Sequence, residues 1–167
     1  MTNELSILGR LIGNAHPPYV IAELSANHNG KLETAMRIVE AAKKAGADAI
    51  KIQTYRPDTI TLNSDKEDFK ISGGLWDGRT LYDLYEEAHM PWEWHEPLFS
   101  HAKRLGITIF SSPFDNTAVD LLANLDAPAY KIASFEAIDH ELIKYVAGVG
   151  KPMIISTGMA DEDEIGE

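Results

Sequence analysis

The stretch "KKAGADAIKIQT", residues 43–54, contains the unit that decides the fold. The end of a helix-like run is followed by a glycine turn, a short apolar strand and polar residues at the strand's end. The same order recurs in "KRLGITIFSSP" (103–113), "ANLDAPAYKIAS" (123–134) and "AGVGKPMIISTG" (147–158), and the apolar run "YVIAELS" (19–25) opens the series. Strands that alternate with helices are joined in parallel by right-handed crossovers. The sequence therefore predicts an α/β fold with five parallel strands.

The spacing of these units indicates a barrel. Helices are expected at 33–45, 92–105, 116–124 and 139–147, and the later strands begin about 20 to 25 residues apart, close to the repeat of a TIM-type (β/α)8 barrel. A complete barrel typically needs about 250 residues, whereas this chain has 167. We therefore expect residues 1–167 to supply about the first five βα units, with the rest of the barrel in a longer protein. The final "ADEDEIGE" is expected to begin the next helix.

One unit is longer than the others. Residues 54–96, "TYRPDTITLNSDKEDFKISGGLWDGRTLYDLYEEAHMPWEWHE", lie between the second predicted strand and the third, and they carry half of the aromatic side chains. Barrel enzymes keep substrate-binding elements in loops that follow the carboxyl ends of strands. We therefore expect this insertion to contribute to a binding site, and a poorly packed surface loop is the alternative.

Composition excludes several classes of protein. The chain has no cysteine, which excludes disulfides and thiolate chemistry and fits a reducing cytoplasm. Its net charge of -11 argues against a surface for nucleic acid or anionic membrane. No apolar run approaches the roughly 18 residues of a membrane span, and the N-terminus lacks a secretory pattern. We expect a cytoplasmic protein that binds neither nucleic acid nor membrane.

Polar side chains gather at the carboxyl ends of the predicted strands, which share one face of a parallel barrel. They are Glu23, Lys51, Gln53, Ser111, Ser112, Lys131, Ser134, Glu136, Ser156 and Thr157. Lys131 lies in the otherwise apolar run "AYKIASFE" (129–136), where an unpaired ammonium is costly. Two lysines with several hydroxyls suit a phosphate or carboxylate ligand. The alternative is that the lysines are solvated or paired with glutamate.

The histidines show no metal-binding spacing. His28 lies in "SANHNG" (25–30), which on its own predicts a turn and a helix cap. His89, His95 and His101 form no H-x-x-x-H pair, and we expect them on the surface. There is also no glycine-rich phosphate loop of the Walker or Rossmann type.

Five motifs together resemble the N-terminal part of the sialic acid synthase family, from about residue 18 to the end. They are "IAELSANHNG" (21–30), "AGADAIKIQTY" (45–55), "FSSPFD" (110–115), "PAYKIASFE" (128–136) and "GKPMIISTGM" (150–159). The family condenses phosphoenolpyruvate with an N-acetylated aldose, makes a nine-carbon nonulosonic acid and releases phosphate. "SANHNG" and "GLWDGRTLYDLYEEAHMPWEWH" (74–95) are more similar to the pseudaminic acid synthase branch, whose sugar is 2,4-diacetamido-2,4,6-trideoxy-altrose, than to the N-acetylneuraminate branch.

The resemblance implies a role for each matching residue. Phosphoenolpyruvate would be held by Lys51, Ser112, Lys131, Ser134 and Ser156. Glu23, Gln53 and Glu136 would face the sugar and the reacting carbons, and Asn27 and His28 would also contact substrate. Either Glu23 or Glu136 can transfer a proton, and the sequence leaves that choice open.

The resemblance also implies partners outside these residues. It predicts an antifreeze-like domain after the barrel, a homodimer, and a divalent manganese or magnesium ion. The ion's ligands are expected beyond residue 167, so none of the six histidines is expected to bind it.

Three other functions stay open. The first is an N-acetylneuraminate synthase that uses N-acetylmannosamine. The second is a Schiff-base aldolase, because lysines on barrel strands can form imines with carbonyl substrates. The third is a non-catalytic module that binds a sugar or a phosphate.

Overall fold

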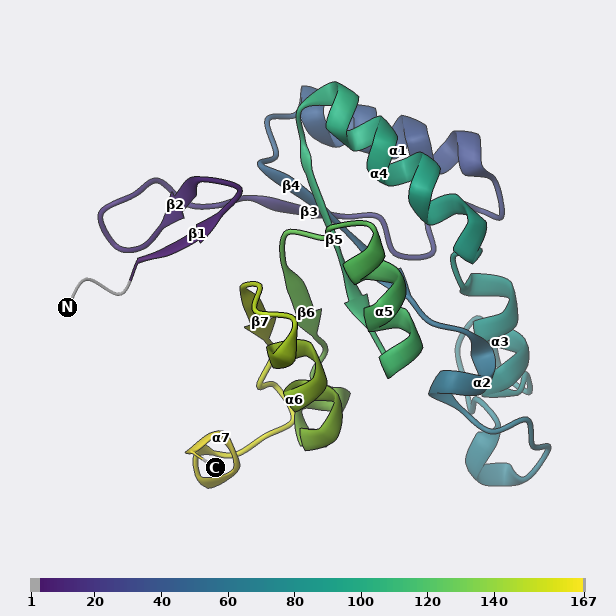
Figure 1. Ribbon diagram of the computed structural model, residues 1–167. Coiled ribbons are helices and arrows are strands. Elements are labelled where there is room, and N and C mark those ends of the chain that lie inside the picture. The colour runs from purple at the N-terminus through teal and green to yellow at the C-terminus, as the bar shows by residue number, and fades with distance from the viewer. Residues whose placement is uncertain (1–3, 167) are drawn as a thin grey trace.

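The computed structural model describes residues 4–166 and contains a five-stranded parallel sheet in the order β3-β4-β5-β6-β7 (Figure 1). The strands are β3 (Ile21–Glu23), β4 (Ala49–Thr54), β5 (Thr108–Pro113), β6 (Tyr130–Ile132) and β7 (Met153–Ile155). Each strand lies beside the next one in chain order, which is the topology of a (β/α)8 barrel. The predicted α/β class and the five parallel strands are confirmed.

The helices lie near their predicted positions, and local signals explain their ends. They are α1 (Leu32–Lys44), α4 (His95–Leu105), α5 (Asn116–Asn124), α6 (His140–Gly148) and α7 (Glu162–Gly166). Gly106 ends α4 in the left-handed conformation, with φ at 66°, which glycine adopts without a Cβ clash. Asp115 begins α5 because its carboxylate accepts hydrogen bonds from the Thr117 and Ala118 amides.

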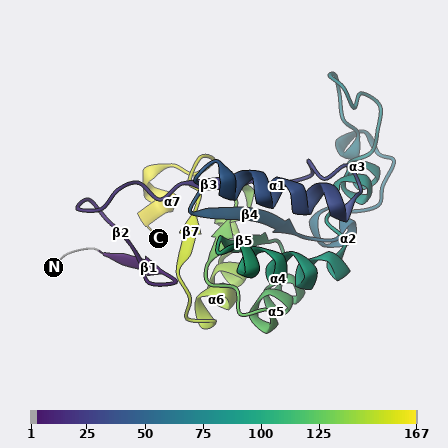
Figure 2. The ribbon, with the colours of Figure 1, turned by 90° about the horizontal axis from the view of Figure 1, so that it is seen from above.

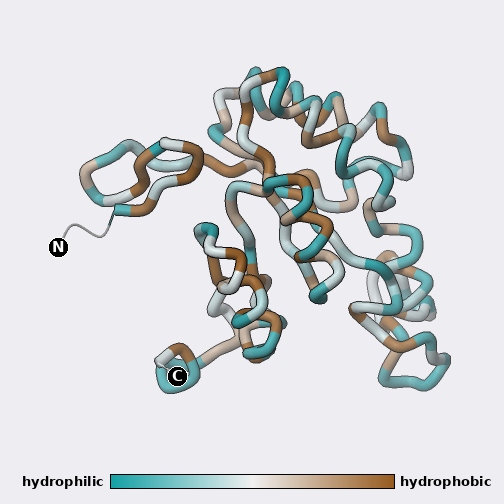
Figure 3. Tube along the Cα trace, in the orientation of Figure 1, coloured by the Kyte–Doolittle hydropathy of each residue, from teal (hydrophilic) through white to brown (hydrophobic). Residues whose placement is uncertain are grey.

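The helices cover the outer face of the sheet. Ile50 and Ile52 of β4 and Ile109 of β5 are buried in one apolar cluster with Val39 of α1 and Leu98 of α4. Figure 1 shows α1 and α4 packed side by side over these strands. Hydrophobic residues recur among hydrophilic ones along the helices (Figure 3), and α1, α4, α5 and α6 each bury one apolar stripe.

A second cluster continues this layer over the later strands. Tyr130 and Ile132 of β6 pack with Leu122 of α5 and Val146 of α6, and all four are buried. These residues form the outer core of the second half of the sheet.

A short antiparallel hairpin, β1 (Leu5–Ile7) and β2 (Arg10–Ile12), was not predicted. Its turn residues Leu8 and Gly9 both have positive φ, 48° and 79°, as a two-residue hairpin turn requires. Such turns are usually recognised by Asn-Gly or Asp-Gly, and the Leu-Gly pair here lacks that signature. Ile7, 1% exposed, packs against the sheet's inner residues.

The insertion after β4 is more ordered than a loop. It contains α2 (Pro57–Ile60), the 3-10 turns η1 (Glu67–Phe69) and η2 (Trp92–Trp94), and α3 (Leu81–Ala88), a helix that the sequence analysis did not predict. Tyr55, buried, contacts the Tyr85 and Phe114 rings edge-on at centroid distances of 5.7 and 5.5 Å. The insertion is therefore anchored to the sheet, and Figures 1 and 2 place α2 and α3 at the opposite end from the β1–β2 hairpin.

Within residues 4–166, no helix has the length and hydrophobicity that crossing a bilayer requires.

Candidate functional site

Strand alternation directs the predicted site residues to the inner face of the sheet. Residues that pair across neighbouring parallel strands project to the same side, and Glu23 pairs with Lys51 while Gln53 pairs with Ser112. Ile50 and Ile52, which alternate with Lys51 and Gln53 along β4, face the helices. The inner-facing polar residues are Glu23, Lys51, Gln53, Ser112, Lys131 and Ser156.

An apolar layer lies directly beneath these polar side chains. It is formed by Ile21, Ala49, Phe110, Ala129 and Ile154, and Ile7 of the hairpin packs against it. This apolar layer excludes water from one side of the polar side chains, which strengthens electrostatic interactions there.

Lys51 is paired within the chain. It is 8% exposed, and its Nζ lies 3.2 Å from the Glu23 Oε1. The Ser25 hydroxyl donates to the other Glu23 oxygen at 3.4 Å. The interpretation of a lysine paired with glutamate therefore holds for Lys51, and the pair carries an exposed carboxylate at the strand ends.

Lys131 has a different environment. Its Nζ donates to the backbone carbonyl of Ile132 at 2.5 Å and to the Ser156 hydroxyl at 2.7 Å, and no carboxylate within residues 4–166 lies at ion-pair distance from it. Burial lowers the pKa of Lys131, the positive charge of Lys51 lowers it further, and the charges of Glu23 and Glu136 oppose both effects. An ammonium can donate three hydrogen bonds, so Lys131 keeps one donor for an incoming anion.

Glu136 is the second carboxylate near Lys131. Its Oε2 is buried and has no hydrogen-bond partner in the described chain. Burial raises the pKa of Glu136, although the charge of Lys131 opposes that shift. The two glutamates therefore differ, because Glu23 is exposed and paired with a lysine while Glu136 is partly desolvated.

The remaining predicted site residues differ in their exposure and surroundings. Ser112 is 2% exposed, Ser134 precedes the 3-10 turn η3 (Phe135–Ile138), and Asn27 is exposed. His28 is 1% exposed and lies edge-on to Trp94 at a centroid distance of 5.3 Å. Its Nδ1 accepts from the Gly30 amide at 3.1 Å, and burial lowers its pKa. Within the described chain, His28 forms no hydrogen bond with Lys51 or Lys131.

The prediction that His95 is a surface residue is wrong. His95 is 0% exposed, and its Nε2 lies 2.8 Å from the Thr54 hydroxyl, which in turn lies 2.6 Å from the Ser111 hydroxyl. Burial lowers the pKa of His95 to about 4, so the ring is neutral near pH 7. Two signals in the sequence were available. His95 shares a helix face with Leu98 and Ala102, and Thr54 and Ser111 alternate with the inner-facing Gln53 and Ser112.

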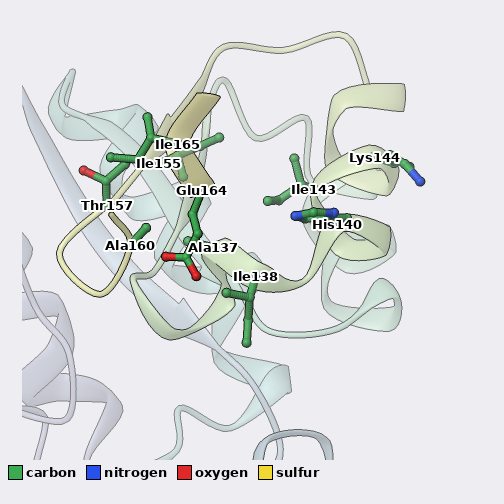
Figure 4. Close-up of a pocket in the computed structure, with 10 residues that line it drawn as sticks. All are labelled: Ala137, Ile138, His140, Ile143, Lys144, Ile155, Thr157, Ala160, Glu164 and Ile165. Carbon is green, nitrogen blue, oxygen red and sulfur yellow. The ribbon is translucent and has the colours of Figure 1, made fainter. Parts of the chain in front are cut away.

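A groove of about 640 Å³ lies outside this site, on the helix side of β7. Ile155 and Thr157 alternate with the inner-facing Ile154 and Ser156, and they line the groove together with Ile138 and Ile165 (Figure 4). The groove is therefore separate from the polar layer.

The described residues do not fit a divalent metal on their own. Residues 4–166 contain no group of three or more His, Asp or Glu side chains placed to hold an ion. The manganese or magnesium ion stays a prediction.

The sequence profile of the NeuB family matches residues 38–167. The chain belongs to the NeuB family. It is 59% identical over 147 residues to the pseudaminic acid synthase of Campylobacter jejuni serotype O:2, an alignment that covers 88% of this chain and 43% of that protein. It is 50% identical to the pseudaminic acid synthase of Helicobacter pylori, over 89% of this chain and 44% of that protein.

The structure agrees with that assignment. The fold matches the N-acetylneuraminic acid synthetase of Leptospira borgpetersenii, solved in complex with citrate, with a TM-score of 0.85, 27% identity and coverage of 99% of this chain and 53% of that one. The five parallel strands are thus part of a (β/α)8 barrel, as predicted, and the resemblance to the sialic acid synthase family is confirmed. The chain spans less than half the length of the curated relatives it matches.

Proposed function

We propose that this chain supplies the first five βα units of a pseudaminic acid synthase, which condenses phosphoenolpyruvate with 2,4-diacetamido-2,4,6-trideoxy-altrose and releases phosphate. The observation that carries this proposal is the 59% identity to a pseudaminic acid synthase across 88% of the chain. The homodimer, the antifreeze-like domain, the divalent ion and the cytoplasmic location stay predictions for the complete enzyme.

The inner face supports an anion site. Lys51 and Lys131 carry two positive charges that act on one another, and Ser112, Ser134 and Ser156 lie at the carboxyl ends of β5, β6 and β7. In this proposal the lysines neutralise the phosphate and carboxylate of phosphoenolpyruvate, and the hydroxyls orient it. The free donor of Lys131 contacts the substrate directly.

The two glutamates suit different proton transfers. The enol carbon forms a bond to the aldehyde carbon of the sugar, and the aldehyde oxygen takes up a proton. Water then adds to the cationic carbon that bears the phosphate, loses a proton, and phosphate leaves with cleavage of the C–O bond. Glu136, whose pKa is raised by burial, is the better proton donor to the aldehyde oxygen, and Glu23, paired with Lys51, is the better acceptor of the proton from water.

The insertion supports the choice of sugar. Tyr55, Tyr85 and Trp92 bring aromatic surface to the carboxyl end of β4, and apolar groups suit acetamido methyls and the methyl group of a 6-deoxy sugar. This part of the chain therefore favours the diacetamido sugar over N-acetylmannosamine.

A specific observation keeps the Schiff-base aldolase as a second candidate. A lysine whose pKa is lowered by burial is also what imine formation needs. Treatment with pyruvate and borohydride separates the two, because an aldolase would be covalently labelled at Lys131 and a condensing synthase would stay unlabelled.

The proposed function is tested with a full-length protein that carries this chain. The protein is assayed for phosphate release with phosphoenolpyruvate and either the diacetamido sugar or N-acetylmannosamine, each with added manganese or magnesium. We expect a clear preference for the diacetamido sugar. A preference for N-acetylmannosamine would assign the chain to the N-acetylneuraminate branch, and labelling by borohydride without phosphate release would favour the aldolase.

A further inference from the structure

A buried chain of hydrogen bonds lies directly behind the candidate site. His95 Nδ1 lies 3.2 Å from the backbone carbonyl of Trp92, and a carbonyl can only accept, so Nδ1 carries the proton. The neutral ring then accepts at Nε2 from the Thr54 hydroxyl, 2.8 Å away. The Thr54 oxygen is left to accept from the Ser111 hydroxyl at 2.6 Å. The hydrogen bonds therefore run in one direction, from Ser111 to Thr54, from Thr54 to His95 and from His95 to the Trp92 carbonyl.

The members of this network are direct neighbours of site residues. Thr54 follows Gln53 on β4, and Ser111 precedes Ser112 on β5. Gln53 and Ser112 are themselves paired across the two strands. Successive residues of a strand point to opposite faces. The network therefore holds the ends of β4 and β5 on their helix side, and the same strand ends carry Gln53 and Ser112 on the inner side.

The network also reaches the aromatic insertion. The indole N–H of Trp92 donates to the Tyr55 carbonyl at 3.4 Å, and the guanidinium of Arg56 lies 3.9 Å from the centre of the Trp92 ring. The chain that leaves β4 is thereby tied to the segment that enters α4.

We propose that His95 is a positioning residue of the active site. Through Thr54 and Ser111 it holds the carboxyl ends of β4 and β5 in register, so that Gln53 and Ser112 keep their places around the substrates. Through Trp92 it ties the end of the insertion to Tyr55, at the insertion's start. The inference rests on the proposed function, because it assigns Ser112 to phosphoenolpyruvate and Gln53 to the reacting centre.

The test compares Thr54→Val with Thr54→Ser in the full-length protein. Valine has nearly the same shape but no hydroxyl, so His95 and Ser111 both lose the Thr54 oxygen, and Ser111 keeps only the Ser112 carbonyl at 3.5 Å. Serine keeps the hydroxyl. We expect Thr54→Val to weaken the dissociation constant for phosphoenolpyruvate and to lower kcat/KM by about 10- to 100-fold, as small misplacements near a reacting centre do. Thr54→Ser should stay within about twofold of the wild type, since the hydrogen bonds remain.

Two further variants keep the test decisive. Ser111→Ala removes only the terminal donor and should lower kcat/KM in the same direction if Thr54→Val fails to fold. His101→Gln is the matched control on α4, because His101 pairs with Glu40 on the outer side, and it should leave phosphoenolpyruvate binding unchanged.

The result that overturns the inference is a lower melting temperature for Thr54→Val with unchanged phosphoenolpyruvate affinity and kcat/KM at a temperature where the protein is folded. That outcome would mean that the network only stabilises the fold. Phosphoenolpyruvate binding tests this inference and the sugar preference tests the proposed function, so each can fail alone. A wild-type protein that binds no phosphoenolpyruvate would overturn both.

Discussion

The two lysines at the strand ends show how one residue type takes two states in one site. Lys51 is balanced by the Glu23 carboxylate at 3.2 Å, whereas Lys131 contacts only neutral oxygens, those of Ile132 and Ser156. A partly buried ammonium without a carboxylate is costly. A bound anion lowers this cost. We therefore expect the ligand to stabilise the Lys131 ammonium more than that of Lys51, which already has a carboxylate partner.

We therefore predict that Lys131→Met weakens phosphoenolpyruvate binding in the full-length protein. A hydrogen bond to a charged group is worth about 1.5 to 3 kcal/mol, so the dissociation constant should rise about 10- to 100-fold by calorimetric titration. Lys144→Met is the control, because Lys144 is exposed and pairs with Glu141 on α6. Equal affinities for the wild type and Lys131→Met would exclude a direct contact.

The same lysine predicts the direction of a pH effect. Only the protonated amine attracts an anion, and burial lowers the pKa of Lys131 below its ordinary value of 10.5. Wild-type affinity should therefore fall as pH rises through that lowered pKa, and this decrease should be missing in Lys131→Met. A decrease of the same size in both proteins would assign the titration to another group.

Residue identity alone predicted part of this site and missed the rest for physical reasons. Glu23, Lys51, Gln53, Ser112, Lys131 and Ser156 were predictable because parallel strands bring their carboxyl ends together. His95 was missed because its partners, Thr54 of β4 and Ser111 of β5, are far from it in the sequence. The helix face that it shares with Leu98 indicated burial, but only the packing shows which groups satisfy its hydrogen bonds.

At the scale of elements, the turns between helices and strands explain why most boundaries were predictable. Gly106 and Gly46 follow α4 and α1 with positive φ, 66° and 89°, and glycine before an apolar run is a strong signal for a helix end. The β1–β2 hairpin and α3 were not predicted. The hairpin's strands and turn are short. α3 does carry helix signals, because Thr80 is its N-cap and Leu81, Leu84 and Tyr85 recur at helical spacing, but they lie in a segment that was expected to be one long loop.

We predict that Gly106→Ala destabilises the protein by about 1 kcal/mol, because a Cβ is disfavoured in the left-handed region. No atom lies within 4 Å of the position a Cβ would take, so the cost is conformational and not steric contact with a neighbour. Gly106→Asn should cost less, since asparagine tolerates this conformation. The measurement is the midpoint of denaturation by urea.

Gly148→Ala provides the matched control. Gly148 is the last residue of α6, has no positive φ and also has open space around it. Alanine there should leave the midpoint unchanged or raise it, because it reduces the freedom of the unfolded chain. If both alanine variants shifted the midpoint equally, the left-handed conformation would not be the cause.

At the scale of the whole molecule, the described chain forms one side of a barrel with two open edges. β3 pairs only with β4 and β7 only with β6 within residues 4–166. The repeat spacing predicted this partial barrel, since the number of βα units follows from the length of chain that each unit takes. The sequence could not show which apolar surface beside β7 is exposed. That depends on which face of the strand each residue points to, and Ile155 points to the groove.

The open edge at β7 leads to a prediction for the 167-residue chain expressed alone. Ile155, Ile138 and Ile165 are 41%, 74% and 53% exposed around one groove, and an unpaired strand edge beside apolar surface recruits other chains. We expect self-association in sedimentation velocity at micromolar concentration. Ile155→Lys should reduce it, because a charge on an edge strand opposes pairing. Leu75→Lys should not, because Leu75 is 87% exposed in the insertion, at the other end of the sheet. A compact monomer over the whole concentration range would show that this edge does not associate.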